Sequence, residues 1–237
     1  MKTLASIQKY FSFALVSALT VNAQVLTPGD IAIIGFNFDN PDQVAIVALA
    51  EIPSGTEIKF TDDGWQSSGS FRGSEGTFTY TAATTIAAGT VVDIGISGPA
   101  LSSSGDQVLA YQGDNSSPTF IYAINSDGSS GVWQSTATSA ATSALPSGLT
   151  NGTDAIAFQE VDNGYYSGTT TGTAAELLAA ISDPANWTTS NSPTDSNSWP
   201  ATFTVTGGGG DPGTTTPTLS LSQSGNSTDA TEGGVTD

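Results

Sequence analysis

Short runs of apolar residues, several of them alternating with polar ones, recur along most of the chain and predict β-strands. Gly, Pro, Asn, Asp or Ser bounds each run. The runs occupy residues 30–38, 43–50, 56–62, 76–82, 90–96, 106–112, 119–124, 153–159 and 201–206. Strands this short, set apart by turn residues, favour an antiparallel sandwich over alternating β-α units. The sequence therefore predicts an all-β domain over residues 24–206.

One short helix is also predicted, in the stretch TGTAAELLAAISDP. Thr173 is placed as its N-cap, and Glu176 follows three residues later, which is the spacing of a capping box. Leu177, Leu178 and Ile181 form one apolar stripe, and Pro184 ends the segment. We expect this helix to pack across an open end of the sandwich.

The first 23 residues have the pattern of a secretory signal peptide. Lys2 and Lys9 form a basic start, an apolar stretch too short to span a bilayer follows, and VNA precedes Gln24. A secreted or cell-surface location is therefore expected. No later segment is apolar and long enough to predict a transmembrane helix.

The C-terminal residues differ in composition from the domain. Residues 207–217 are rich in Gly, Thr and Pro and are interpreted as a flexible linker. Residues 218–237 contain one strand pattern and a turn, and an isolated strand cannot bury itself. We therefore interpret the chain as the N-terminal part of a longer parent, whose further domains would be its partners.

The charge balance is strongly acidic. All 22 acidic residues follow the signal segment, where Lys59 and Arg72 are the remaining cations, so the formal charge there is 2 − 22 = −20. Such a chain repels phosphate backbones, which argues against nucleic-acid binding, and attracts divalent cations loosely.

Cysteine and histidine are both absent from the sequence. Their absence excludes disulfides, thiolate zinc sites, cysteine nucleophiles and any triad or metalloprotease site that needs imidazole. Acid–base chemistry is limited to carboxylates, Lys59 and tyrosines. The fold must be held by its core or by calcium on oxygen ligands.

The stretch FTDDGWQSSGSFRGSEGTFTY, residues 60–80, gathers the most suggestive side chains: Asp62, Asp63, Trp65, Arg72 and Glu75. A catalytic interpretation pairs two carboxylates beside a tryptophan that stacks on sugar. A metal interpretation assigns Asp62, Asp63 and Glu75 as calcium ligands. Adjacent carboxylates on a strand point to opposite faces, which makes them a poor acid–base pair.

A structural interpretation of the same stretch is favoured. In it, an aspartate side chain caps the turn, Gly64 adopts a backbone conformation that other residues avoid, and Trp65 folds over the edge of the core. Arg72 would pair with one of the nearby carboxylates.

Other loops carry weaker signals. Residues 37–43 and 125–131 offer oxygen ligands without an EF-hand motif, so calcium there stays open beside an ordinary turn. Residues 161–168 place Tyr165 and Tyr166 in a glycine-flanked loop. With Trp65 they suggest a carbohydrate-binding surface, although buried aromatic wedges are the commoner use.

Taken as a set, several motifs resemble a lamin-tail-like module of secreted bacterial proteins. They are GDIAIIGFNFDNPDQVAIVAL, FTDDGW, the FR-x-x-EGTFTYT stretch, LPSGLTNGTDAIAF, DNGYYSG and LLAAISDPANW. The resemblance covers roughly residues 26–206 and implies an immunoglobulin-like antiparallel sandwich without catalytic residues. Under it, FTDDGW is a signature turn.

The tail is similar to the opening of a Calx-beta repeat. By that resemblance, Glu232 matches a calcium-ligating glutamate. The resulting expectation is a non-catalytic accessory module for adhesion, spacing or presentation, with calcium as a possible stiffening ion. The alternatives are the accessory domain of a secreted nuclease or phosphatase, and a carbohydrate-binding sandwich.

Overall fold

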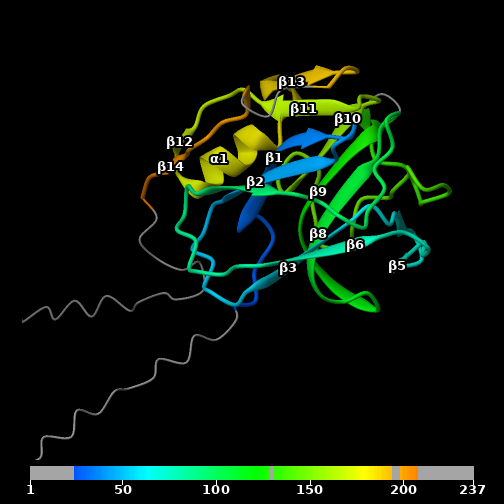
Figure 1. Ribbon diagram of the computed structural model, residues 1–237, viewed down its shortest axis with the longest axis horizontal. Helices are drawn as coiled ribbons and strands as arrows, with labels where there is room; N and C mark the ends of the chain where they lie inside the picture. Colours follow the sequence, from blue (N-terminus) through cyan, green and yellow to red (C-terminus); the bar gives the residue numbers. More distant parts are fainter. Residues whose placement is uncertain (1–23, 129–130, 194–197, 208–237) are drawn as a thin grey trace, which may run out of the picture.

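A computed structural model describes residues 24–128, 131–193 and 198–207. Two five-stranded sheets pack face to face, with one short helix (Figure 1). The β-sandwich and its single helix are therefore confirmed. The predicted signal peptide (1–23), the Calx-beta-like segment (218–237) and the linker (207–217) beyond Gly207 lie outside the described residues.

The first sheet is antiparallel throughout, with strand order β13-β11-β1-β2-β7. Its strands are β1 (Ile31–Asn37), β2 (Gln43–Ala48), β7 (Val91–Ile94), β11 (Asn163–Tyr166) and β13 (Trp187–Ser190).

The second sheet has the order β10-β9-β8-β3-β6 and is mixed. Its strands are β3 (Glu57–Thr61), β6 (Thr77–Thr81), β8 (Gln107–Asp114), β9 (Ser117–Gly128) and β10 (Ala155–Gln159). β10 runs parallel to β9, which departs from the purely antiparallel prediction. The reason is that the chain after β9 returns along the sheet before β10 begins, instead of turning back directly.

Several short elements complete the fold. β4 (Trp65–Gln66) pairs with β5 (Ser70–Phe71), and β12 (Thr171–Gly172) pairs with β14 (Thr204–Val205). A 3-10 helix at Pro184–Asn186 leads into β13. β11 occupies part of the segment that the sequence suggested was a loop. The loop interpretation was wrong. β11 can pair with β1 because Gly164 has no side chain and leaves room for the ring of Phe36, which a Cβ at this position would approach to 2.8 Å.

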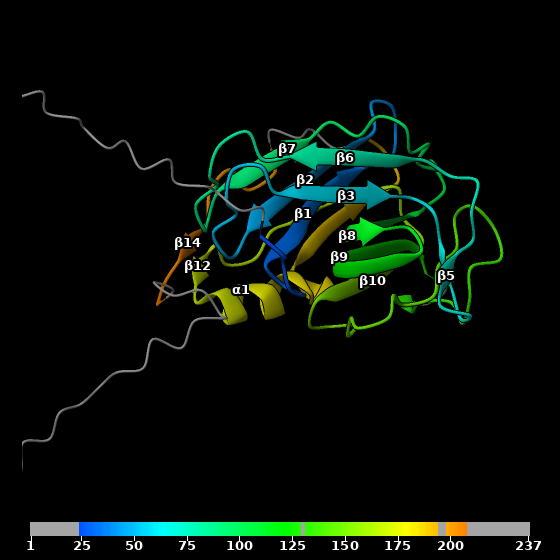
Figure 2. The same ribbon diagram turned by 90° about the horizontal axis from the view of Figure 1, so that it is seen from below.

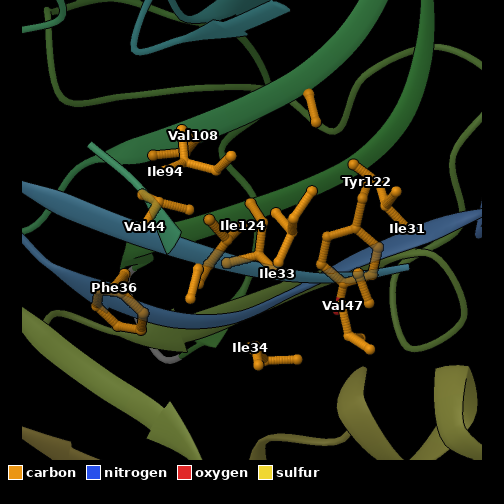
Figure 3. Packing of buried hydrophobic residues seen from close by; sticks show 14 of the residues in the cluster. Ile31, Ile33, Ile34, Phe36, Val44, Val47, Ile94, Val108, Tyr122 and Ile124 are labelled. Atoms are coloured by element: carbon orange, nitrogen blue, oxygen red, sulfur yellow. The ribbon is translucent and has the colours of Figure 1, made fainter. Parts of the chain in front are cut away.

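The main core lies between the two sheets (Figure 3). Ile33 and Val44 of the first sheet face Val108 and Ile124 of the second, and all four are essentially inaccessible to solvent. Phe36 also bridges the sheets, with its ring 5.7 Å from that of Phe158.

The central strands are buried on both sides. All seven residues of β1 are buried. On the outer side, a Cβ on Gly35 would lie 2.6 Å from the indole of Trp199, so only glycine allows this ring to lie flat on the strand. The helical ribbon in Figure 3 lies on the same side of β1 as Ile34.

A second apolar cluster covers the outer face of the second sheet. Leu109 and Tyr111 belong to it, whereas Val108 and Ala110 face the main core, as alternation along β8 requires. Trp65 lies edge-on to Phe120 at a ring separation of 4.9 Å. The β4–β5 hairpin is therefore a cover for this face.

The helix α1 (Ala174–Ile181) forms as predicted. The Thr173 hydroxyl accepts a hydrogen bond from the backbone N–H of Glu176, and the Glu176 carboxylate accepts one from the backbone N–H of Thr173. Leu177 and Ile181 are its buried residues. The helix packs at the end of the sandwich where β1 begins, opposite β5 (Figure 2).

Both described ends of the domain lie at this helical end (Figures 1 and 2). The backbone N–H of Gln24 donates to the hydroxyl of Thr56, just before β3 starts. At the other end of the domain, a Cβ on Gly207 would lie 3.7 Å from the Thr173 side chain. The opposite end of the sandwich is thus the one farther from both.

Thr173→Ala should lower the free energy of unfolding by about 1 kcal/mol, because it removes the side-chain half of the capping box. Chemical denaturation monitored by circular dichroism measures this. Thr85→Ala, at an exposed position outside helices and strands, is the control and should stay within about 0.5 kcal/mol of the wild type. Equal losses in the two variants would contradict the capping role.

Candidate functional site at the acidic end

Acidic side chains gather at the end of the sandwich opposite α1. β1, β3, β9 and β10 end there, and β2, β6, β8 and β11 begin there. The acidic residues in or next to these turns are Asp39, Asp42, Asp62, Asp63, Glu75, Asp106, Asp127, Glu160 and Asp162. This acidic end lies on the right in Figure 2, near β5.

Asp62 and Asp63 follow β3 and hold two different loops. The backbone N–H of Ala100 donates to Asp62 Oδ2 at 2.8 Å. The backbone N–H of Gly73 donates to both oxygens of Asp63, at 2.8 and 3.0 Å. Both side chains are buried. Both aspartates thus have the structural role that was favoured, but the predicted cap of their own turn was wrong. Each holds another segment, and the Thr61 hydroxyl accepts the N–H of Asp63 within the turn.

Gly64 is required for a reason other than the predicted one. It does not appear among the described residues with positive φ, so the expected unusual backbone conformation was wrong. Instead, a Cβ at this position would lie 2.1 Å from the carbonyl oxygen of Thr142 and 2.8 Å from Ala137. Glycine is needed because the loop of residues 133–149 packs directly on the turn.

Trp65 joins the turn to that same loop. Its backbone N–H donates to the hydroxyl of Ser143 at 2.9 Å, and its carbonyl accepts from the N–H groups of Ala137 and Ala144 at 3.0 and 2.9 Å. Its ring is 5% exposed and lies within the second apolar cluster. Trp65 thus covers the sheet, as the structural interpretation predicted.

Arg72 pairs with Glu75. The guanidinium lies 3.0 Å from Glu75 Oε1, and the backbone N–H of Arg72 donates to the carbonyl of Gly64. Burial raises the pKa of Glu75, and the charge of Arg72 opposes that rise. Burial also raises the pKa of Asp63, again opposed by Gly73 and Arg72.

Asp106 is the most perturbed acid at this end, and the sequence analysis missed it. It precedes an ordinary strand pattern, and no local signal separates it from other turn aspartates. Its two oxygens accept hydrogen bonds from the backbone N–H groups of Gln107 and Ser102, both at 2.8 Å. Burial nevertheless raises its pKa to about 8, and the charges of Asp62 and Glu75 add to that rise.

Four buried polar atoms near these acids have no hydrogen-bond partner among the described residues. They are Asp62 Oδ1, Glu75 Oε2, Gln107 Oε1 and Arg72 Nε. Buried polar atoms are nearly always satisfied. Three of the four are acceptors, so the acidic end has more acceptors than the surrounding protein groups satisfy.

The second acidic turn, residues 37–43, is held by amides. The Asn37 side chain donates to the carbonyls of Asp39 and Pro41, and the Asn163 side chain donates to Asp39 Oδ2 at 2.8 Å. Asp42 accepts from the backbone N–H of Leu101. Within residues 125–131, Asn125–Gly128 belong to β9, and residues 129–130 lie outside the described part.

The aromatic residues suggested for carbohydrate binding do not form an exposed platform. Trp65 and Tyr166 are buried, and Tyr165 is half-buried within β11. The Tyr166 hydroxyl donates to the carbonyl of Thr169, and its ring stacks on Phe203. Assigning Trp65 and Tyr166 to sugar stacking was therefore wrong, because both rings are packed in apolar clusters.

No group of three or more Asp or Glu side chains within the described ranges is arranged to hold a metal ion. Of the predicted calcium ligands, Asp62, Asp63 and Glu75 lie at the acidic end, with both Asp63 oxygens engaged by Gly73. Glu232 lies outside the described residues.

A shallow cavity of about 420 Å³ opens at the same end of the sandwich, beside the end of β10. Its lining includes Phe158, Glu160, Val161, Pro184, Thr189 and Asn191. Glu160 is its one carboxylate, so this cavity does not bring together a pair of acid and base groups.

Comparison with known proteins found no matching family model, no similar curated protein and no similar solved structure. Along the described chain, the search for a helix long and apolar enough to cross a membrane found none. The resemblance to lamin-tail-like modules thus stays a prediction.

Gly64→Ala should destabilise the protein by about 1–3 kcal/mol, because the added methyl group meets the backbone of Thr142. Gly95→Ala is the matched control, since a Cβ there has no atom within 4 Å. Denaturant midpoints of both variants test this. If Gly64→Ala is as stable as Gly95→Ala, the close packing of the two loops is refuted.

Protein stability should fall as pH rises from 5 to 8. The folded Asp106 carboxyl keeps its proton up to about pH 8, whereas the unfolded group loses it near its ordinary value of 3.8. Between pH 5 and pH 8, unfolding therefore releases a proton from Asp106. The free energy of unfolding decreases by about 3 kcal/mol from pH 5 to pH 8.

Urea denaturation at several pH values, with chelator present, measures this slope. Asp106→Asn should flatten most of it, whereas Asp93→Asn, at an exposed position in β7, should leave it intact. A wild-type protein that gains stability between pH 5 and pH 8 would refute the assignment.

Proposed function

We propose that the chain is a non-catalytic accessory module of a secreted or cell-surface bacterial protein. The observation that carries this proposal is how the candidate chemical groups are used. Asp62 and Asp63, the most suggestive carboxylates in the sequence, are buried and accept backbone hydrogen bonds from loops. Carboxylates that hold loops in this way support a structural role for these residues and not a catalytic one.

The placement of the chain ends favours presentation over spacing. Gln24 and Gly207 both lie at the helical end of the sandwich (Figure 2). A module entered and left at one end adds little length between its neighbours. It projects its other end outward, and here the projecting end is the acidic one.

Export and processing test the extracellular part of the proposal. Expression of the full chain in a Gram-negative host should yield a mature protein outside the cytoplasm that begins at Gln24, as N-terminal sequencing of the exported fraction reads. Added protease should leave a resistant fragment that ends near residue 207.

Leu15→Arg provides the matched control, because a charge in the apolar stretch blocks a signal peptide from functioning. This variant should remain in the cytoplasm at full length. Wild-type protein that also stays there, with residues 1–23 intact, would refute the proposal.

A further inference from the structure

The geometry points to one calcium ion at the acidic end, bound by Asp62, Glu75 and Gln107. This inference goes beyond the accessory role and does not depend on export. It rests on three acceptor atoms that the fold places around the start of the TDDGW turn and leaves without a protein donor.

Asp62 provides the first ligand. Its side chain is 3% exposed, and its two oxygens differ in their surroundings. Oδ2 accepts the N–H of Ala100 at 2.8 Å, whereas Oδ1 is buried without a partner. An unpaired carboxylate oxygen in a buried position is costly unless a cation or proton compensates it.

Gln107 provides the second ligand. Its side chain is completely buried, and its Nε2 donates to the carbonyl oxygens of Asp62 and Ala140. These two bonds hold the amide against the Asp62 backbone. They leave Oε1 as a fixed, unpartnered acceptor beside the same residue.

Glu75 provides the third ligand. Arg72 engages Oε1 at 3.0 Å, and Oε2 is buried without a partner. The next residue, Gly76, packs on the loop that holds Asp62: a Cβ there would lie 2.2 Å from the carbonyl oxygen of Gly98. The hydroxyl of Thr61 also donates to the carbonyl of Gly76, so the residues next to Asp62 and Glu75 are in direct contact.

The local charge also favours a cation. Asp62, Asp63 and Glu75 carry −3 when ionised, and Arg72 supplies +1, which leaves −3 + 1 = −2. Asp106 is not counted, because burial raises its pKa to about 8 and it keeps its proton at neutral pH. A divalent ion neutralises the remaining charge.

Calcium fits this ligand set better than a transition metal. The ligands are carboxylate and amide oxygens, which suit hard cations, and calcium accepts further carbonyls and waters in an irregular shell. Two carboxylates and one amide predict a dissociation constant of roughly 10⁻⁴ to 10⁻³ M, the range of extracellular calcium modules.

This ligand set differs from the one predicted by sequence. Asp63 is excluded, because Gly73 occupies both of its oxygens. Gln107 is added, although it follows Asp62 by 45 residues. The difference provides a control variant: Asp63→Asn should weaken the loop but keep the calcium response.

The experiment is calcium titration of the purified full chain by isothermal calorimetry, with thermal unfolding in calcium and in chelator. The wild type should bind one ion. Its unfolding midpoint should rise by about 5 °C or more at a calcium concentration a hundred times the dissociation constant. Asp62→Asn and Glu75→Gln should each reduce the affinity at least tenfold, whereas Asp63→Asn and Asp93→Asn should retain it.

Circular dichroism establishes that each variant is folded. If Asp62→Asn does not fold, Glu75→Gln decides, because Glu75 lies in a loop and is partly exposed. No binding by the wild type overturns the proposal, and so does full calcium affinity in both ligand variants. A magnesium response equal to the calcium response overturns the assignment to calcium. None of these outcomes bears on export, so the two proposals fail separately.

Discussion

The central strands of both sheets are apolar on both faces, and this constraint governs the rest of the fold. A two-layer sandwich buries only the inner faces, so β1 and β8 each need an additional cover. Trp199 and α1 cover the first sheet, and Trp65 with the β4–β5 hairpin covers the second. Much of the chain outside the strands therefore covers the outer faces of the two sheets, in addition to connecting one strand to the next.

The acidic end follows from how the second cover is attached. The chain must leave β3, cross to the outer face and return to β6 within the turn region of one sheet edge. Backbone N–H groups in such reversals lack strand partners, and Asp62, Asp63 and Asp106 accept hydrogen bonds from them. Using carboxylates for this purpose concentrates buried negative charge where the loops meet, with Arg72 as the one cation in these turns.

The sequence predicted what local patterns determine. Alternation located most strands, and the Thr173 capping box located the helix, because both depend on residues a few positions apart. Contacts across the chain were not accessible in this way: Gly64 is required by Thr142, and Gln107 contacts Asp62. Asp106 was missed for the same reason, since its burial depends on loops that converge from distant segments. The parallel placement of β10 likewise depends on the path of a long connection.

The shared position of Gln24 and Gly207 has a mechanical consequence. Tension applied through these two residues acts at one end of the sandwich, where β1 begins beside its antiparallel neighbour β2 and before its pairing with β11 starts at Gly35. Hydrogen bonds in antiparallel pairs lie across the strands, so such a load opens them in succession from Ile31 instead of stressing them all together. The domain therefore resists pulling weakly when the force passes through it from one neighbouring domain to the next. It is better suited to a side position, in which the neighbouring domains transmit the force directly to each other.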